Sequence, residues 1–417
     1  MNNLEELDFE IPKNIKWDIL VLDDVKSPEK RSIISGPFGS NISSKYFTKS
    51  GVPVIRGNNL SNNLGVKFRD SGFVFISPEK AEELNSWAIK EDLLFTAAGT
   101  IGQVGILTGK ELFEKYTISN KQLRVRLNKN IINPFYAYYW FASPTIVDII
   151  IQRDTGSTIP LINLGVLKSL PILLPPLPEQ ESIAEALSSI DDKIDLLHRN
   201  NKTLEQLAET LFRQWFVEEA EDSWEEVKLS SIIDVRDGTH DSPKQSSIGY
   251  HLITSKHLKP NGIDFLNAYK ISEEDYIEVN KRSKVDKNDI LFSMIGTLGL
   301  IHLVDQEPNF AIKNMGLFKT SKKPEYVYYV YLLFRSSLGE KFIYENADGS
   351  TQEYITLGSL RNFEFKYPEY NKIVKFNQYV TEYFLKISAN NKQLTQLETL
   401  RDTLLPKLMS GVVRVEN

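Results

Sequence analysis

The chain has 417 residues, of which 41% are hydrophobic and 25% charged, a balance typical of globular proteins with room for two or three domains. It holds no cysteine, which excludes disulfides and thiolate metal sites, and no apolar run approaches the roughly 18 residues of a membrane span. The net charge is −6, yet residues 179–225 alone carry 4 Lys/Arg against 13 Asp/Glu, a net −9, which leaves +3 for the remainder. This distribution permits a basic groove outside one acidic segment. The first residues form no apolar signal core, so we expect a cytoplasmic protein.

Most landmarks of the chain occur twice. The run DLLFTAAGTIG at residues 92–102 returns as DILFSMIGTLG at residues 289–299. Two further motifs recur in the same order, Gly-Ser-Thr at 156–158 and 349–351 and Asn-Asn-Lys at 200–202 and 390–392. Two copies of one unit indicate pseudo-twofold symmetry, which suits a ligand with two halves or two identical partner subunits.

Each copy is predicted to be a mixed domain. In chain order it has a Trp-led alternating strand, a glycine-containing turn, an apolar strand running into a polar loop, and an aromatic helix. The ranges are 15–22, 36–40, 52–60 and 134–141 in the first copy, and 223–229, 237–243, 250–258 and 326–334 in the second. We therefore predict α+β domains at residues 1–178 and 221–370.

One long helix follows each domain, at residues 179–220 and 371–417. Apolar residues recur every seven positions, with a second row four residues later, which predicts a coiled-coil seam. Asn201 and Asn391 are expected at equivalent seam positions, where a polar side chain lowers stability and fixes register. The predicted seam residues are Ile183, Leu187, Ile190, Ile194, Leu197, Asn201, Leu204, Leu211, Val380, Phe384, Ile387, Asn391 and Leu394.

A helix over residues 179–217 is roughly 57 Å long and has little else to bury its seam against. The economical partner is the other long helix, antiparallel because of the twofold relation between the copies. We therefore expect two pseudo-twofold-related α+β domains separated by two long antiparallel coiled-coil helices.

The start of the first long helix carries a family resemblance. Residues 174–184 (LPPLPEQESIA), which lead into residues 190–195 (IDDKID), resemble the central conserved region of specificity subunits of type I restriction-modification systems. Residues 400–411 (LRDTLLPKLMSG) are similar to the C-terminus of the same family. The helix start is also physically sound, because Pro178 suits a first turn and Glu179 and Glu181 suit the positive end of the helix dipole.

The resemblance, which covers essentially the whole chain, implies a non-catalytic subunit. Each domain would be a target-recognition domain that reads one half of a split double-stranded DNA sequence, and the helices would set the spacer. Two modification (adenine methyltransferase) subunits would dock on the helices, and restriction subunits would complete an ATP-dependent endonuclease. S-adenosylmethionine, ATP and Mg would belong to these partner subunits, and no cofactor to this chain.

The residues that would read DNA are expected in loops, since base edges need side-chain donors and acceptors and phosphates need Lys, Arg or backbone N–H groups. In the first domain they are Ser40, Asn41, Lys45, Arg56, Asn58, Asn59, Thr96, Thr100 and Lys121. In the second they are Thr239, His240, Lys244, Lys256, His257, Ser293, Thr297 and Lys313. Because the two loop sets differ strongly, we predict two different half-sites and an asymmetric target.

Signals for catalysis are weak. Residues 133–136 (NPFY) resemble the Asn-Pro-Pro-Tyr/Phe loop of adenine methyltransferases but lack its second proline, so we interpret them as a helix entry. The glycines of residues 99–105 are not followed by the Gly-Lys-Ser/Thr of a phosphate-binding loop, and the five histidines show no metal-ligand spacing. We predict no catalytic residue and no metal. Two alternatives stay open: a coiled-coil adaptor with two ligand domains that are not DNA-specific, and a self-sufficient methyltransferase or nuclease.

Overall fold

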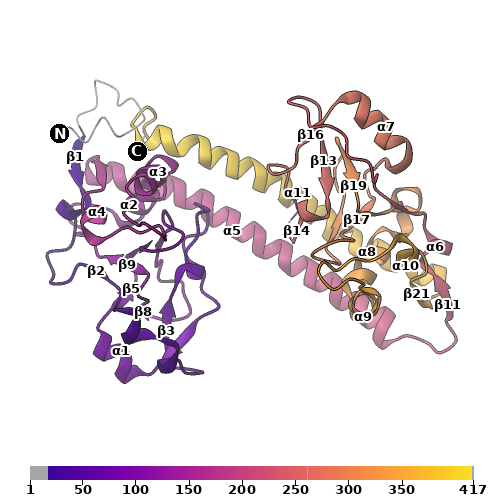
Figure 1. Ribbon diagram of the computed structural model, residues 1–417, viewed down its shortest axis with the longest axis horizontal. Helices are drawn as coiled ribbons and strands as arrows, with labels where there is room; N and C mark the ends of the chain where they lie inside the picture. The colour runs from indigo at the N-terminus through magenta and orange to yellow at the C-terminus, as the bar shows by residue number, and fades with distance from the viewer. Residues whose placement is uncertain (1–16, 261, 416–417) are drawn as a thin grey trace. The chain divides into compact units, whose positions relative to one another are not determined.

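The chain forms two compact units that repeat one order of elements (Figure 1). The computed structural model describes residues 17–260 and 262–415, so residues 15 and 16 of the first predicted strand lie outside the described residues. Unit 1 comprises the chain up to Leu197 and again from Gln393, and unit 2 comprises His198–Lys392. Each long helix therefore contributes to both units.

Unit 1 has two four-stranded sheets and a separate pair formed by its first and last strands. In the pair, β1 (Asp18–Val21) runs antiparallel to β10 (Pro171–Leu174). One sheet has the antiparallel order β2 (Ile33–Ser35), β9 (Gln122–Val125), β6 (Leu93–Thr96) and β7 (Val104–Ile106). The other has the order β4 (Val74–Ile76), β3 (Val52–Ile55), β8 (Lys115–Ile118) and β5 (Trp87–Ile89), with β3 and β8 parallel. Its helices are α1 (Pro78–Leu84), α2 (Pro134–Phe141), α3 (Pro144–Gln152), α4 (Leu164–Lys168), the first part of α5 (Leu177–Arg213) and the last part of α11 (Tyr370–Met409).

Unit 2 repeats this plan. β11 (Glu225–Lys228) pairs with β21 (Glu364–Tyr367), and the antiparallel sheet has the order β12 (Val235–Asp237), β20 (Gly316–Phe318), β17 (Ile290–Phe292) and β18 (Ile301–Leu303). The mixed sheet has the order β16 (Lys270–Ile271), β13 (Tyr250–Thr254) and β19 (Phe310–Lys313), with β13 and β19 parallel, and a separate pair joins β14 (Leu258–Lys259) to β15 (Gly262–Ile263). Its helices are α6 (Leu229–Ile232), α7 (Glu273–Ser283), α8 (Val327–Arg335), α9 (Ser337–Asn346), α10 (Leu357–Arg361), the second part of α5 and the first part of α11. The predicted duplication is thus confirmed in the order of the elements, although among the described residues β5 has no counterpart in unit 2 and the β14–β15 pair has none in unit 1.

Short 3-10 turns punctuate both units. They are η1 (Leu22–Asp24), η2 (Gly39–Ile42), η3 (Ser44–Tyr46), η4 (Gly57–Asn59), η6 (Ser255–His257), η7 (Thr320–Lys322) and η8 (Pro324–Tyr326). η4 and η6 follow the equivalent strands β3 and β13, so they are a matched pair.

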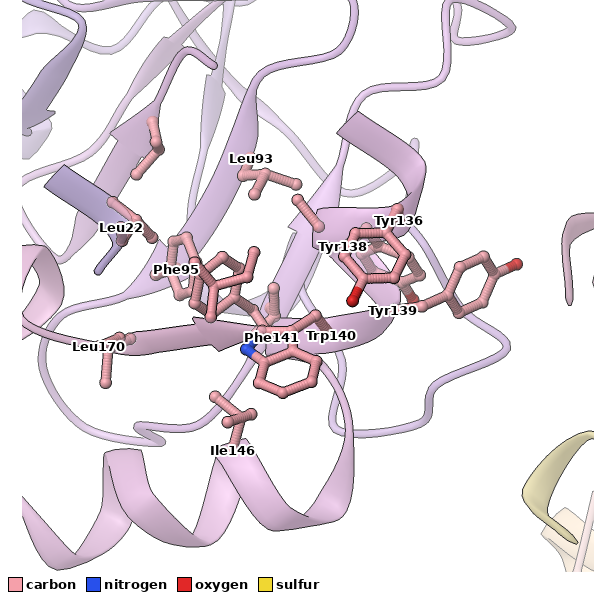
Figure 2. Packing of buried hydrophobic residues seen from close by; sticks show 14 of the residues in the cluster. Leu22, Leu93, Phe95, Tyr136, Tyr138, Tyr139, Trp140, Phe141, Ile146 and Leu170 are labelled. Carbon is pink, nitrogen blue, oxygen red and sulfur yellow. The ribbon is translucent and has the colours of Figure 1, made fainter. Parts of the chain in front are cut away.

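The aromatic helix α2 is the centre of the unit 1 core. Asn133 caps it by accepting hydrogen bonds from the N–H groups of Phe135 and Tyr136, and Pro134 occupies its first turn, so the helix-entry interpretation of residues 133–136 is confirmed. Its aromatic side chains pack among Leu22, Leu93 and Phe95 (Figure 2). In unit 2 the matching helix α8 covers the predicted range to within one residue and packs in the same way.

The long helices run antiparallel wherever they meet inside a unit. In unit 1, Ile194 and Leu197 of α5 cluster with Leu394 of α11. In unit 2, Phe212 of α5 contacts Phe376 of α11 with ring centroids 5.8 Å apart. The remaining apolar seam residues are buried or partly buried in the same three clusters as their partners: Ile183, Leu187, Ile190, Leu204, Leu211, Val380, Phe384 and Ile387. α5 continues as a π-helical turn over Gln214–Glu218, and α11 ends at Met409, earlier than predicted.

The asparagine pair of the seam differs from the prediction. Asn390 is buried there, whereas Asn391 is exposed. Asn201 meets both: its amide donates to Asn391 Oδ1 over 2.8 Å, and its Oδ1 accepts from Asn390 Nδ2 over 2.7 Å. The helices therefore meet at a cluster of three asparagines, because the stripe of α11 is rotated by one residue from a strict heptad match.

Candidate functional site

Strand direction brings four loops of unit 1 to one edge. Because β3 and β8 are parallel, both end at the same edge of their sheet. β9 starts there after the three-residue turn 119–121, and its antiparallel neighbours β2 and β6 both end there. The loops after β2, β3, β6 and β8 consequently meet, although they lie up to about eighty residues apart in the sequence.

Backbone hydrogen bonds fix these loops to one another. The Ser119 N–H donates to Ile55 O over 2.9 Å, and the Gly36 N–H donates to Gln122 O over 2.9 Å. A Cβ on Gly36 would lie 1.8 Å from Ser119 O, so this close approach requires glycine. The edge is thus an ordered surface held by main-chain contacts.

A cavity of about 470 Å³ opens at this edge. It collects four of the predicted residues, Asn58, Thr96, Thr100 and Lys121. It also collects three that the sequence did not indicate, Arg69, Gln103 and Gln122. Arg69 joins the site through the η4 turn, since its N–H donates to Asn59 O over 2.8 Å.

The cavity of unit 1 is suited to acceptor-rich ligands. Within the described part of the chain, its lining contains no carboxylate, and Arg56, Arg69 and Lys121 at this edge form no ion pair. The Arg56 Nε and the Gln122 Nε2 are buried and have no hydrogen-bond partner among residues 17–260 and 262–415. Unneutralised cations and free donors on ordered loops are what phosphates and acceptor edges of bases require.

The remaining unit 1 candidates divide by burial. Ser40, Asn41 and Lys45 are exposed in the turns η2 and η3, beside this edge rather than in the cavity lining. Thr96 lies at the cavity wall and donates its hydroxyl to Gln103. Asn59 is a correction: its side chain is fully buried, accepts from the Arg56 N–H and donates to Arg69 O and Ser71 O. It closes the η4 turn and cannot contact a base.

Unit 2 forms the same edge with other side chains. The loops after β12, β13, β17 and β19 meet, and the Met294 N–H donates to Ser255 Oγ, which in turn donates to Asn314 O over 3.0 Å. His240 is exposed there and held by Asn314 Oδ1 at 2.8 Å and Asp237 Oδ2 at 2.9 Å. Exposed Lys244 and Lys256 form no ion pair among the described residues, and half-buried Lys313 contacts Ser242.

Three unit 2 candidates are also corrections. His257 is 1% exposed, and its Nδ1 accepts from the Thr254 N–H, so its Nε2 carries the proton and donates to Asn267 O. Burial, reinforced by Lys256, lowers the pKa of His257 below its ordinary value. Thr239 and Ser293 are buried and bonded within their own loops. All three shape the loops and cannot contact bases as placed.

Thr297 lies in a different environment. It is exposed and lines a hollow of about 1150 Å³ beside Glu205 and Glu209 of α5. Arg335 forms ion pairs with both glutamates, at 3.3 Å and 2.7 Å. Burial raises the pKa of Glu205. Further carboxylates, Glu340 and Glu353, line the same hollow, so this acidic surface disfavours phosphate and argues against Thr297 as a DNA contact.

The start of α5 has a buried anchor that the sequence did not reveal. Gln180 is fully buried, accepts from the Asn133 N–H over 2.8 Å and donates to Ile131 O and Pro175 O. The glutamine of the Pro-Glu-Gln-Glu motif therefore ties the helix start to the entry of α2.

The described residues hold no group of three His, Asp or Glu side chains that could bind a metal ion. In that same part of the chain, no helix combines the length and apolar character needed to cross a membrane.

Three comparisons place these observations among known proteins. The family model for the type I restriction modification DNA specificity domain matches residues 30–206 and again residues 221–399. The type I restriction enzyme MjaIX specificity subunit of Methanocaldococcus jannaschii is 27% identical, over 97% of this chain and 95% of that protein. The type I restriction enzyme EcoBI specificity subunit of Escherichia coli is 23% identical, over 87% and 80%. The crystal structure of the type I restriction-modification S subunit from M. genitalium superposes with a TM-score of 0.60 at 18% identity, over 96% of this chain and 98% of that one.

Proposed function

The chain belongs to the type I restriction modification DNA specificity family, and on that premise we propose that it directs a type I restriction-modification complex to a split, asymmetric DNA sequence. One observation carries the proposal. The same strand edge occurs in both units, and in each it presents polar side chains and cations that form no ion pair within the described ranges, yet the side chains differ.

The difference between the two edges supports an asymmetric target. At the exposed central position of η4, unit 1 has Asn58, while η6 of unit 2 has Lys256. The turn between β8 and β9 of unit 1 has three residues, whereas the turn between β19 and β20 of unit 2 has two, so Lys121 has no counterpart of equal position. Two edges with different chemistry read different bases.

The chain itself is a specificity subunit and non-catalytic. In the proposed complex, two modification subunits dock on the long helices and methylate adenine with S-adenosylmethionine, and restriction subunits with ATP and Mg cleave DNA. The acidic segment 179–225 supports this division, since its net −9 charge is unfavourable next to a DNA backbone and available to protein partners.

Methylome sequencing tests the proposal. A host that carries this chain with its modification subunit should show one bipartite adenine-methylated motif, and deletion of this chain should abolish that motif. A methylome that is unchanged by the deletion contradicts the proposal, and a palindromic motif contradicts the asymmetric target.

An adaptor with two ligand domains that are not DNA-specific is the second candidate, supported by the duplicated architecture alone. Specific DNA binding whose affinity falls steeply with salt excludes it, because phosphate neutralisation releases counterions.

A further inference from the structure

A buried ion cluster lies where a recognition loop of unit 1 meets the helix pair. Asp191 of α5 is 3% exposed, and its Oδ2 accepts from Lys67 Nζ over 2.9 Å and from the Tyr139 hydroxyl over 2.6 Å. Its Oδ1 lies 3.3 Å from Arg401 Nη1 of α11. Lys67 Nζ also stands 5.4 Å from the centre of the Tyr139 ring. One carboxylate therefore joins a loop, a core helix and both long helices.

Tyr139 acts in this cluster as a fixed donor. Burial and the neighbouring Asp191 raise the pKa of its hydroxyl well above the ordinary value, so the group stays protonated. In Figure 2 its hydroxyl points away from the apolar cluster that holds the rest of α2. Tyr139 thus directs its hydroxyl to α5, while the aromatic rings of α2 pack in the core.

The loop that bears Lys67 leads directly into the recognition cavity. Its Leu64 O accepts from the Tyr138 hydroxyl over 2.6 Å, and a Cβ on Gly65 would lie 2.5 Å from Arg401 Nη1. Two residues beyond Lys67, Arg69 lines the cavity and is bonded to the η4 turn. Loop 60–69 is consequently bonded to the helix pair through Lys67 and to the η4 turn of the site through Arg69.

We propose that Asp191, with Lys67 and Arg401, is a positioning cluster that sets the placement of the Arg69 loop relative to the helix pair and so determines specificity at one half-site. This inference rests on the proposed function. It also predicts an asymmetry, because no described residue of the equivalent loop of unit 2, which follows η6, forms an ion pair with a long helix; Lys259 Nζ, for example, donates to Lys256 O. A change in the cluster should therefore affect the half-site read by unit 1 and leave the other unaltered.

Lys67→Met is the most specific test, because it removes the ion pair between the loop and Asp191 and preserves the Asp191–Arg401 pair. Asp191→Asn also removes the contact with Lys67, but it takes the carboxylate from half-buried Lys67 and leaves buried Arg401 with Asp402 alone, so it carries a risk of misfolding. Asp192→Asn is the matched control: it removes the same charge one residue away, where the side chain is 61% exposed and forms an ion pair with exposed Lys110. Lys67→Arg is the conservative rescue.

The measurement is DNA binding by the full chain with its modification subunits, using duplexes that carry single base changes in either half-site. Lys67→Met should lower discrimination by about tenfold at one half-site only, roughly the contribution of one specific base contact. That half-site should be the one relaxed by Arg69→Ala. Asp192→Asn should discriminate like the unaltered chain, and Lys67→Arg should restore most of the loss.

Two outcomes overturn the inference. One is full discrimination by Lys67→Met at both half-sites, and the other is an equal loss at both, which indicates general destabilisation. Failure of the proposed function looks different, because the unaltered complex would then show no discrimination at all.

Discussion

The paired turns η4 and η6 separate two roles that a polar loop residue can have. His257 fills the η6 turn of unit 2 as Asn59 fills the η4 turn of unit 1, and both accept from the N–H three residues earlier, Thr254 in one and Arg56 in the other. We predict that His257→Asn leaves the recognised DNA sequence unchanged. Lys256→Ala, one residue away on the exposed side, should weaken DNA binding without altering stability.

The expected stabilities follow from the hydrogen bonds. His257→Ala leaves the Thr254 N–H and the Asn267 carbonyl without their partner and opens a small cavity, for a loss of about 3 kcal/mol in the free energy of unfolding. Asn keeps an acceptor for the Thr254 N–H and loses only the bond to Asn267, so His257→Asn should lose about 1 kcal/mol.

The pH dependence gives a second signature. Because burial lowers the pKa of His257 below its ordinary 6.5, the unfolded state binds more protons than the folded state just below that pH. The stability from neutral His257 is complete above pH 6.5 and declines as the pH falls below it, by at most about 1.4 kcal/mol per unit. His302, whose pKa burial also lowers, contributes in the same direction, so His257→Asn should reduce this slope without abolishing it.

Thermal unfolding of the full chain between pH 5 and 8 measures the stabilities, and methylome sequencing measures the specificity. An altered half-site in His257→Asn refutes the structural role and restores His257 as a base contact. An unchanged pH slope in that variant refutes the assignment of the proton.

Four further outcomes follow. Lys121→Gln should weaken binding to all sequences alike and reduce the salt-dependence slope by about 1, as measured by titration at several salt concentrations. Phe38→Ser should lower DNA affinity at unchanged melting temperature, since this 84%-exposed ring stands on the ordered loop beside the site. Asn201→Leu should lower the melting temperature, because the buried Asn390 amide loses its acceptor. Adding Asn390→Leu should reverse that loss. Insertion of one helical turn next to Asn201, matched in α11, should lengthen the methylated spacer with unchanged half-sites.

The duplicated plan was predictable because short segments of sequence determine where helices and strands begin. Asn133 and Pro134 specify the start of α2, because asparagine caps a helix and proline suits its first turn. The matching DLLFT and DILFS segments became the equivalent strands β6 and β17 for the same reason. The directions of these strands then place the predicted loops at the same edge of each unit.

Burial of polar side chains was not predictable in that way. Asn58 and Asn59 are identical neighbours in a polar loop, yet one is exposed and the other fills its own turn. Arg69 entered the site through hydrogen bonds to Asn59, ten residues distant, which no local pattern encodes. Arg401 interrupted the apolar stripe of the C-terminal helix because it faces Asp191, a partner 210 residues away.

The exchange of Asn59 for His257 shows how one scaffold accommodates two specificities. In each turn the side chain that closes the loop points inward and satisfies backbone groups, while its neighbour, Asn58 or Lys256, points outward. Asparagine and histidine both close the turn by accepting from the N–H three residues earlier, and the outward side chain takes no part in that bond. Stability and recognition thus reside on alternate residues of the same turn, and new half-sites can arise by substitution of the exposed residue alone.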